Sequence, residues 1–306
     1  MFKRNISNPI YEELLKLKLI SNKNLIEISQ KTRDKNISVI QDKETKIIFL
    51  KKNIITKNYY NIQKNLIDKK TKLIKRGKTY VQLENKKIKT NSLNDDQRRL
   101  KMFKKFVIKK DILDFGCGWG EFLNICKASR SRSGVEIREI PYKYIKKKFK
   151  SINVQKNLNH FQSKFDVITM FHVLEHIPNQ VKILKSIKSK LKKNGKIFIE
   201  VPHAEDFLIS QINLEEYKKF TFWSEHLILH TFKSLRTILK AAGFKKIEIS
   251  FYQRYGLSNH LGWFIKKKPG GHVFFKNLIS KNSNRYYSNM LKKLQKTDTL
   301  IASAIC

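Results

Sequence analysis

Residues 111–121 constrain the fold more than any other part of the chain, because they read D-I-L-D-F-G-C-G-W-G-E. A short apolar run stops at three glycines on alternate positions, and an amphipathic run follows directly. This pattern predicts a strand, a tight turn and a helix, the unit that opens a nucleotide-binding α/β sheet. Glycines let the backbone turn sharply and approach a ligand closely, and a helix start offers unpaired N–H groups. The glycines are Gly116, Gly118 and Gly120.

Two acids accompany this turn. Asp114 stands two residues before the first glycine, and the spacing is G-x-G-x-G rather than the G-x-G-x-x-G of a dinucleotide site. A carboxylate at that place suits a ligand with a cationic amine better than a pyrophosphate. Glu136 ends the next expected strand, where such folds accept hydrogen bonds from ribose hydroxyls.

Four blocks of sequence carry a family resemblance. The D-x-G-x-G-x-G turn resembles motif I of the class I S-adenosylmethionine (SAM)-dependent methyltransferases. G-V-E-I at 134–137 resembles the second strand of that fold. K-F-D-V-I-T-M-F-H-V-L-E-H-I at 164–177 resembles its fourth strand and the next turn, and L-K-K-N-G-K-I-F-I-E-V-P-H at 191–203 resembles the helix–Gly–strand unit that follows. The blocks keep the family order over residues 104–251.

The resemblance implies an α/β fold with SAM as cofactor. The sheet would be doubly wound, Rossmann-like, seven-stranded and mostly parallel, with an antiparallel last strand. Asn157 and Leu158 follow the third strand, where the family contacts adenine, although many members have Asp there. Phe171 and His172 end the fourth strand, where ligands bind in such sheets. The expected cofactor contacts are Asp114, Gly116, Cys117, Gly118, Gly120, Glu136, Asn157, Leu158, Phe171 and His172.

Apolar patterns predict alternating strands and helices after Asp111, as in a doubly wound sheet. We expect strands at 111–115, 133–137, 152–155, 165–170, 196–201, 245–252 and 297–305. We expect helices at 119–128, 140–149, 178–192 and 231–242. The methyltransferase domain would cover 101–306, with insertions at about 203–230 and 253–295.

Residues 1–100 are expected to form an N-terminal appendage. Its patterns predict a helix at 11–26, a hairpin at 38–50, a polar arm at 57–90 and an amphipathic helix at 94–107. Some related methyltransferases carry a small zinc ribbon at this position. The cysteines that a ribbon needs are absent here, so a metal-free appendage is expected.

The net charge of +40 allows two interpretations. A basic chain can bind nucleic acid or an anionic membrane surface. However, the lysines are scattered in twos and threes over every element, and Arg, the better reader of bases, is scarce. We therefore expect weak, nonspecific attraction to polyanions rather than a dedicated nucleic-acid site.

Three cysteines without C-x-x-C pairing indicate a reducing compartment and no structural zinc. The sequence has no apolar run long enough for a transmembrane span and no secretory pattern at its start. A cytoplasmic protein is expected, and the oligomeric state is left open.

H-V-L-E-H at 172–176 has several interpretations. It matches the zinc motif of inverted zinc proteases, but it follows a core strand and runs into Pro178, which leaves no long metal-binding helix. Quinone-ring O-methyltransferases suggest a divalent metal at such a cluster. The remaining interpretations are a structural role and a general base. We expect no metal and rank the candidate bases as His176, then His226, then His172.

Two later segments are candidate acceptor contacts. F-W-S-E-H-L at 222–227 could hold an acceptor and remove its proton, or could seat the segment on the core. Residues 253–272 resemble a tail segment of methyltransferases linked to bacterial surface-polysaccharide and sugar biosynthesis. Their polar residues (Arg254, Asn259, His260 and His272) could form a sugar subsite, or the segment could be a helical cap.

The expected function is methyl transfer from SAM to an oxygen or nitrogen of a small polar acceptor, a sugar or nucleotide-sugar of cell-surface glycan biosynthesis. The alternatives are an RNA-directed ribose methyltransferase, a quinone or small-aromatic O-methyltransferase, and a catalytically silent SAM-fold binding protein. An Asn-Pro-Pro-Tyr-like motif for base methylation is absent from the fourth strand, where T-M-F-H stands instead.

Overall fold

The computed structural model describes residues 6–54, 67–68, 73–76, 79–82, 91–275 and 277–306. The chain groups into two compact units. The first unit comprises Met1–Ile54, His172–Lys188 and Phe198–Cys306, and the second comprises Ile55–Phe171 and Ser189–Ile197. The expected division into an appendage (1–100) and a methyltransferase domain (101–306) stays a prediction.

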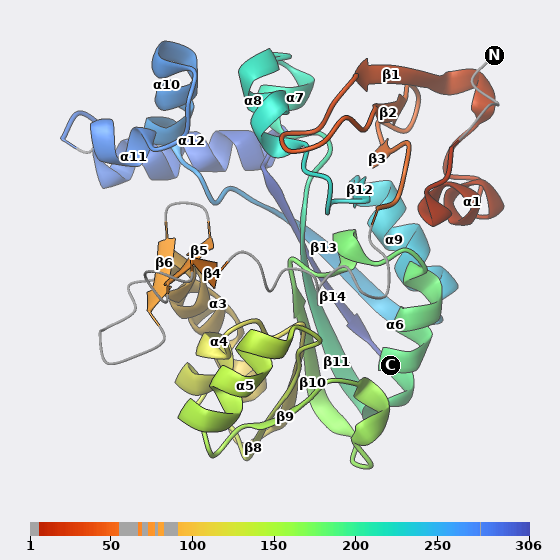
Figure 1. The fold of residues 1–306 in the computed structure, drawn as a ribbon, viewed down its shortest axis with the longest axis vertical. Helices are drawn as coiled ribbons and strands as arrows, with labels where there is room; N and C mark the ends of the chain where they lie inside the picture. The colour runs from red at the N-terminus through yellow and green to blue at the C-terminus, as the bar shows by residue number, and fades with distance from the viewer. Residues whose placement is uncertain (1–5, 55–66, 69–72, 77–78, 83–90, 276) are drawn as a thin grey trace. The chain divides into compact units, whose positions relative to one another are not determined.

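The larger sheet has seven strands in the order β13-β14-β11-β10-β7-β8-β9 (Figure 1). Strands β10, β7, β8 and β9 pair in parallel, whereas β13 and β14 pair antiparallel. This arrangement confirms the predicted fold class. The strands are β7 (Asp111–Phe115), β8 (Ser131–Val135), β9 (Asn153–Gln155), β10 (Phe165–Phe171), β11 (Leu191–Pro202), β13 (Lys245–Tyr252) and β14 (Thr299–Ile305).

In the second unit, the buried strand β7 fixes the position of the glycine turn. Ile112 and Leu113 are almost fully buried, and β7 pairs with β10 on one side and β8 on the other. The turn after β7 therefore opens at the carboxyl edge of parallel strands, where ligands bind in such sheets. Helices α4 and α5 pack on β8 and β9, and α3 packs on α4. These helices are α3 (Asn91–Val107), α4 (Glu121–Ile125) and α5 (Glu139–Lys148).

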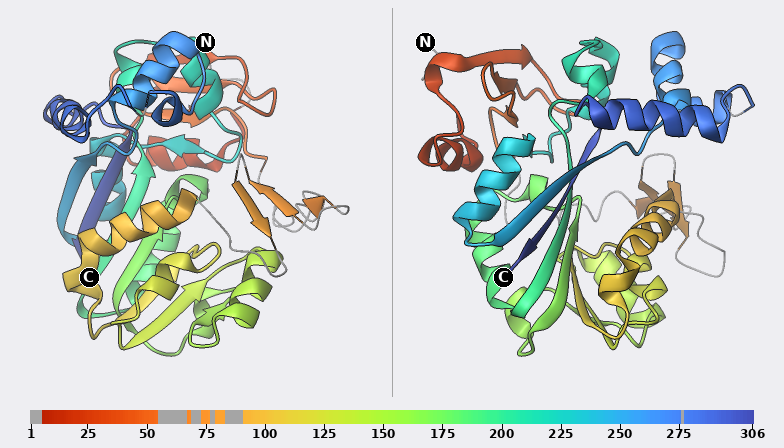
Figure 2. Two further views of the ribbon diagram at one scale, coloured as in Figure 1. Left: turned by 90° about the vertical axis from the view of Figure 1, so that its left-hand side faces the viewer. Right: turned by 180° about the vertical axis from the view of Figure 1, so that it is seen from behind.

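In the first unit, helix α9 (Phe232–Ala241) packs against β13 and β14 (Figure 2). It begins with a capping box between Thr231 and Ser234, which satisfies two backbone N–H groups at the helix start. Its buried face includes Leu235, Ile238 and Leu239. Three other helices of this unit are α6 (Gln180–Ser189), α7 (Phe207–Ser210) and α8 (Glu215–Thr221).

A four-stranded antiparallel sheet combines strands from two parts of the first unit that lie far apart in the sequence. Strands β1 (Leu25–Ser29), β2 (Val39–Asp42) and β3 (Ile48–Leu50) follow one another, and β12 (Ile228–Leu229) pairs with β3. The β2–β3 pair is the hairpin expected at 38–50. Asp42 closes its turn by accepting hydrogen bonds from two backbone N–H groups at 3.0 and 2.9 Å. The pairing with β12 ties the loop before it to the N-terminal strands.

Several predicted helices are longer than the observed ones. Helix α6 covers 180–189 instead of 178–192, because β11 already begins at Leu191. Helix α1 (Pro9–Lys16) ends before Lys18, which has a left-handed φ of 54°, so the prediction of helix beyond Lys16 is wrong. The apolar residues after it are buried by core packing rather than by a helix face. Helix α4 covers 121–125 instead of 119–128, because Gly120 has a left-handed φ of 80° and the chain turns at Cys126 toward β8.

The described part of the expected arm forms a small antiparallel sheet of β4 (Ile67–Asp68), β5 (Leu73–Arg76) and β6 (Thr79–Gln82); the rest of residues 57–90 lies outside the described residues. Helices α10 (Leu257–Lys266), α11 (Gly271–Phe274) and α12 (Lys281–Lys293) occupy the insertion expected at 253–295.

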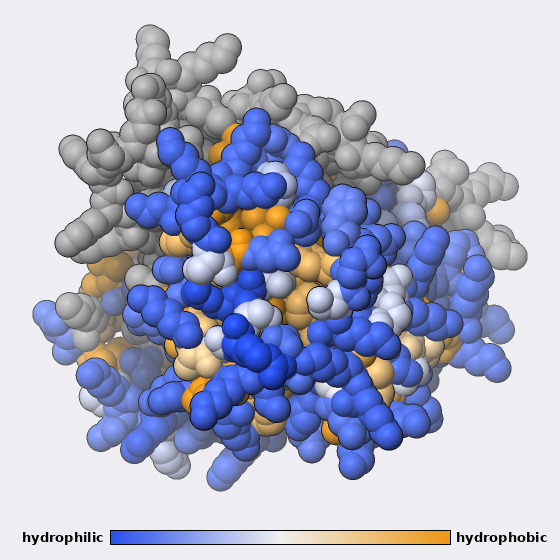
Figure 3. Space-filling view, turned by 90° about the horizontal axis from the view of Figure 1, so that it is seen from below, coloured by the Kyte–Doolittle hydropathy of each residue, from blue (hydrophilic) through white to orange (hydrophobic). Residues whose placement is uncertain are grey.

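Within the described ranges, none of the helices has the length and apolar character needed to cross a membrane. Hydrophilic side chains predominate on the face shown in Figure 3, in keeping with the scattered lysines.

Candidate active site

The glycine turn after β7 has the backbone that the sequence requires. Gly116, Gly118 and Gly120 have φ values of 80°, 59° and 80°. These values lie in the left-handed region of backbone conformation, which residues with a Cβ rarely adopt. A Cβ placed on Gly118 would meet only the Arg138 side chain, at 3.7 Å. The space beside Gly118 is therefore open to a ligand, as a cofactor cradle requires.

Asp114 and Glu136 are both buried beside this turn, with exposures of 4% and 3%. The hydroxyl of Thr169 donates to Asp114 Oδ1 at 2.7 Å. Burial raises the pKa of Asp114 to about 7, and the hydrogen bond from Thr169 offsets part of this effect. The Glu136 carboxylate accepts three hydrogen bonds from Arg138, one from the backbone and two from the guanidinium, at 2.8 to 2.9 Å.

The other expected cofactor residues of the second unit have varied surroundings. Cys117 is a free, buried thiol that packs against Gly134, and burial raises its pKa. Asn157 is exposed and caps the next turn by accepting from the Asn159 N–H at 2.9 Å, and Leu158 is buried. Phe171 lies in an aromatic cluster rather than at an open surface: its ring stacks on Phe103 and meets Phe122 edge-on, with the Arg99 guanidinium 4.6 Å away.

The second unit has the donor set that SAM needs. The open space at Gly118 can take the ligand backbone, and two buried carboxylates can face an amino group and ribose hydroxyls. Sequence reasoning missed two further features. Trp119 Nε1 is buried with no hydrogen-bond partner among the described residues, and Ile137 is 53% exposed directly after Glu136. An exposed apolar side chain at that place offers a surface for a planar base.

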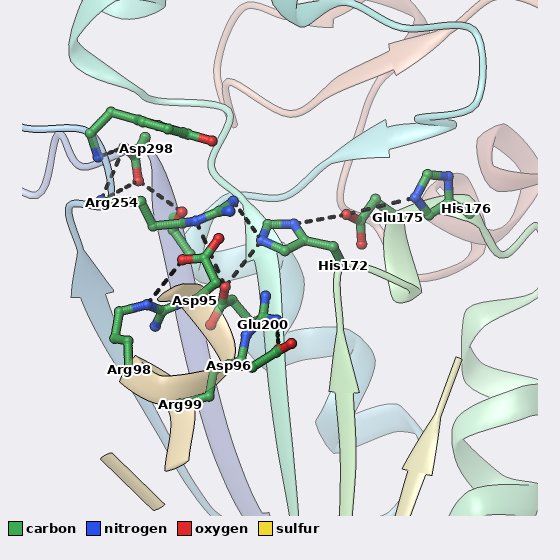
Figure 4. A network of polar contacts seen from close by, with 12 residues as sticks. Asp95, Asp96, Arg98, Arg99, His172, Glu175, His176, Glu200, Arg254 and Asp298 are labelled. Atoms are coloured by element: carbon green, nitrogen blue, oxygen red, sulfur yellow. Dashed lines mark hydrogen bonds and ion pairs between the residues drawn. The ribbon is translucent and has the colours of Figure 1, made fainter. Parts of the chain in front are cut away.

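In the first unit, His172 lies between two buried carboxylates (Figure 4). Its Nδ1 is 3.2 Å from Glu175 Oε1, and its Nε2 is 3.1 Å from Glu200 Oε1. Arg254 Nη1 is 2.8 Å from the same Nε2, which cannot donate to Glu200 and accept from Arg254 at once. Burial and Arg254 lower the pKa of His172, but the hydrogen bonds with both glutamates outweigh them and raise it above its ordinary value. Both ring nitrogens of His172 thus have protein partners within hydrogen-bond distance.

His176 has a different environment. Its Nδ1 lies 2.7 Å from the carbonyl oxygen of Glu225, which can only accept, so Nδ1 carries the proton. Nε2 then holds the lone pair, and it lies 3.9 Å from Glu175 Oε1. The side chain is 18% exposed, so Nε2 belongs to a partly open imidazole in the correct tautomer for a base. Sequence reasoning ranked this residue first but could not identify Glu225 as its partner.

His226 packs beside His176, with ring centroids 5.0 Å apart. Burial and the neighbouring His176 lower the pKa of His226 to about 3, so it is neutral. Ligand atoms of Glu175, His176 and His226 all lie within 4.8 Å of one another. Two of the residues have buried polar atoms without a hydrogen-bond partner among the described residues, namely Glu175 Oε2 and His226 Nδ1. No metal was predicted, yet this cluster has the nitrogen and oxygen donors that divalent cations take.

The segment around Trp223 is held by the loop between β1 and β2. The Arg33 guanidinium lies 5.1 Å from the Trp223 ring centroid, and the Ser224 hydroxyl donates to Asp34 at 2.6 Å. Trp223 and His226 are partly exposed, whereas Phe222 and Leu227 are buried. Phe222 and Leu227 therefore seat the segment, and Trp223 and His226 are the members that a ligand could reach.

Other buried histidines, and some of the polar residues expected at a sugar subsite, have structural partners. His203 contacts the Thr297 carbonyl at 2.9 Å, and His260 contacts the Tyr287 hydroxyl at 2.8 Å. Burial lowers the pKa of each imidazole to about 4. Asn259 pairs with the exposed His272 at 3.2 Å. Of the polar residues expected to form a sugar subsite, Arg254 is the one that contacts His172.

Comparison with known proteins gives the family of the chain. A family model described as a methyltransferase domain matches residues 88–249, more than half of the chain. An uncharacterised protein of Methanocaldococcus jannaschii is 34% identical over 125 residues, which is 39% of this chain and 53% of that protein.

Two named enzymes are also similar. A tRNA U34 carboxymethyltransferase of Campylobacter jejuni is 26% identical over 162 residues, 49% of this chain and 54% of the enzyme. A ubiquinone biosynthesis O-methyltransferase of Actinobacillus pleuropneumoniae is 31% identical over 103 residues, 29% of this chain and 44% of the enzyme. The chain thus spans about half the length of the curated relatives that it matches.

Among solved structures, a SAM-dependent methyltransferase from Archaeoglobus fulgidus is similar with a TM-score of 0.49 and 23% identity, over 70% of this chain and 94% of that one. A possible histamine N-methyltransferase from Thermotoga maritima has a TM-score of 0.46 and 16% identity, over 69% and 88%. The family match and the glycine turn with its two acids lead to one conclusion: the chain belongs to the methyltransferase-domain family and contains a class I SAM-dependent methyltransferase domain.

Proposed function

We propose that the chain methylates a hydroxyl group of a small polar acceptor, a sugar or nucleotide-sugar, with His176 as the general base. One observation carries this proposal: the hydrogen bond from His176 Nδ1 to the Glu225 carbonyl leaves the lone pair on Nε2. Of the three histidines ranked as bases, His172 has both ring nitrogens in contact with glutamates, and burial together with His176 lowers the pKa of His226 to about 3. His176 is therefore the best proton acceptor of the three.

The proposed reaction is an in-line displacement. SAM supplies a methyl group on a positively charged sulfur. The acceptor oxygen forms the new C–O bond as the C–S bond breaks, and the sulfur keeps the bonding electron pair as a neutral thioether. His176 Nε2 takes the proton of the hydroxyl, and the nearby Glu175 carboxylate stabilises the imidazolium that forms. Most of the rate would come from holding donor and acceptor in alignment.

Two observations support a sugar or nucleotide-sugar as the acceptor. The 253–272 segment resembles the tail of sugar-linked methyltransferases, and Arg254 from that segment contacts His172. An arginine side chain suits an acceptor that carries a phosphate, as nucleotide-sugars do. The carboxymethyltransferase relative acts on tRNA by its name, so an RNA acceptor is the alternative to include in any assay.

A second candidate is metal-assisted O-methyl transfer at the same residues. The unpartnered Glu175 Oε2 and His226 Nδ1 favour it, because a divalent cation would satisfy both atoms. A cation bound there would lower the pKa of an acceptor hydroxyl directly. His176 would then be a ligand rather than a base.

The test compares turnover of the wild type with three variants, His176→Ala, His226→Ala and His272→Ala. Formation of S-adenosylhomocysteine (SAH) would be followed with nucleotide-sugars, free sugars, quinols and bulk tRNA as acceptors, with and without EDTA. His272 is an exposed histidine and serves as the matched control. For a general base we expect a loss of roughly 100-fold or more in kcat for His176→Ala, with SAM affinity within about threefold of wild type.

The outcomes separate the candidates. Activity of the wild type in EDTA, with a loss of turnover in His176→Ala and none in His272→Ala, supports the base. Loss of activity in EDTA with restoration by one divalent cation, and equal losses in His176→Ala and His226→Ala, supports the metal-assisted reaction and refutes the base. Full turnover of His176→Ala refutes both, and methylation of tRNA alone refutes the sugar acceptor.

A further inference from the structure

The segment between β13 and β14 differs in charge from the rest of the chain. Residues 249–297 contain ten lysines and arginines and no aspartate or glutamate. All 25 acidic residues of the protein therefore lie outside this segment. This is the longest stretch of the chain without an acidic side chain, so no carboxylate within it offsets the ten positive charges. Its three helices, α10, α11 and α12, lie side by side within the first unit (Figure 2).

The same segment carries most of the large apolar side chains that are exposed in the described residues. Four of them are exposed by nearly two thirds or more: Ile265 64%, Val273 67%, Leu278 75% and Tyr286 79%. Exposure of single apolar side chains is ordinary, but a group on adjacent helices indicates an interaction surface. The set is Tyr255, Ile265, Val273, Phe274, Leu278, Tyr286, Met290 and Leu294.

Cationic and apolar groups share one surface here. The ammonium groups of Lys266 and Lys268 lie 5.0 and 5.5 Å from the centroid of the Phe274 ring. Beneath them, Gly262 of α10 and Gly271 of α11 are in direct contact, since a Cβ on Gly262 would lie 2.7 Å from the Gly271 Cα. The close contact between α10 and α11 therefore keeps Lys266 and Lys268 near Phe274.

We propose that this surface, formed by α10, α11 and α12, binds the surface of an anionic lipid bilayer. Lysines beside exposed aliphatic and aromatic side chains are the composition of interfacial membrane segments, in which the charges meet lipid headgroups and the apolar side chains enter the acyl boundary. The proposal goes beyond methyl transfer: it would place the enzyme at a membrane surface whichever acceptor it uses.

Two other occupants fit the surface less well. A second copy of the chain would bring the same cationic segment against itself, and the segment contains no acid to compensate. RNA would meet the lysines, but it offers nothing to the exposed aliphatic side chains Ile265, Leu278 and Leu294. Single-stranded RNA is bound by aromatic side chains and arginines; the surface exposes Tyr255, Phe274 and Tyr286, but the segment contains two arginines against eight lysines.

The test is sedimentation of the full chain with large unilamellar vesicles. Vesicles of phosphatidylcholine alone would be compared with vesicles that contain about 30% phosphatidylglycerol, at ~0.15 M salt. We expect binding to the anionic vesicles only. The charge variant is Lys266→Gln/Lys267→Gln/Lys268→Gln, for which we expect affinity to fall roughly 100-fold. The apolar variant is Leu278→Ser, for which we expect a fall of roughly tenfold.

Each variant has a matched control. Lys146→Gln/Lys147→Gln/Lys148→Gln removes three adjacent exposed lysines from α5, and Ile212→Ser removes an exposed apolar side chain outside the segment. All four changes are on exposed side chains, so thermal unfolding and SAH binding should match the wild type. We expect both controls to retain binding within about threefold.

Four results would overturn the proposal: no binding to anionic vesicles, equal binding to both vesicle types, equal losses in the α5 control and the α10 variant, or no effect of Leu278→Ser. A parallel titration with polyuridylate identifies the main alternative. If the α10 lysines control polyuridylate binding and vesicles do not bind, the surface is an RNA site and the bilayer proposal is wrong.

Discussion

Asp114 should make cofactor affinity depend on pH. Burial raises the pKa of this carboxyl to about 7, and the charges of Asp96 and Glu136 add to the shift, against the hydrogen bond from Thr169 and the charge of Arg99. The amino group of SAM or SAH is a cation, and it would bind the ionised form of Asp114 better than the protonated form. Below about pH 7, ligand binding must therefore release a proton from Asp114.

The size of the effect follows from this pKa. With a pKa of about 7 in the free protein, about half of the Asp114 carboxyls are ionised at pH 7 and about 1% at pH 5. The Kd for SAH should therefore rise roughly 50-fold between pH 7 and pH 5, equal to about 2.3 kcal/mol. Asp114→Asn keeps the shape and removes the titration. This variant should bind more weakly at pH 7 and show little dependence on pH.

Isothermal titration of SAH into the wild type and Asp114→Asn, at several values between about pH 5 and pH 7.5, measures both quantities. Repeating the titrations in buffers with different ionisation heats counts the protons released, and we expect about one near pH 5.5 for the wild type. A flat Kd in the wild type would refute the reasoning. An equal slope in Asp114→Asn would assign the proton to another group.

Three further predictions concern other parts of the molecule. Glu136→Ala should weaken SAH binding by about 1–3 kcal/mol by calorimetry, because the ribose hydroxyls lose a charged acceptor, and an unchanged Kd would remove Glu136 from the site. Burial, together with Asp298, raises the pKa of Asp206 in the folded state to about 7, above its value in the unfolded chain. The contribution of Asp206 to folding stability is therefore fully present below about pH 4 and is lost as the pH rises through 7. Urea unfolding should therefore show that Asp206→Asn loses less stability than the wild type between about pH 5 and pH 8, and equal losses would contradict this. Any RNA binding in a filter assay should fall steeply with salt and show little sequence preference, and tight, sequence-selective binding at ~0.15 M salt would contradict that expectation.

Local sequence was enough to predict the glycine turn and its acids. Gly116, Gly118 and Gly120 have the left-handed backbone that their spacing indicated, and the buried acid Glu136 directly follows β8. These features are set by residues close together in the chain, so spacing reports them. The same holds for the hairpin closed by Asp42.

The environment of the histidines could not be predicted in this way. His176 takes its partner from Glu225, and His172 takes its partners from Glu200 and Arg254, residues 28 to 82 positions away. Sequence alone gives no distance between such groups, so it could rank His176 but not fix its tautomer. The pairing of β12 with β3 could not be predicted for the same reason. The two apolar residues of β12 do not indicate which strand they pair with, and β3 lies about 180 positions earlier in the chain.

The most direct test of SAM binding at the glycine turn is calorimetric titration of SAH into the wild type, Gly118→Ala and Gly243→Ala. Both glycines have left-handed φ values, 59° and 84°, so each alanine should cost a similar ~1–2 kcal/mol of stability. Gly118 faces open space in the free protein, whereas Gly243 lies beside Lys188 Nζ, outside the expected site. We predict micromolar affinity for the wild type and Gly243→Ala, and a loss of roughly tenfold or more for Gly118→Ala, because its methyl group would occupy the place of the ligand. No heat with the wild type, or equal affinity in all three proteins, would contradict the assignment of this turn as the cofactor site.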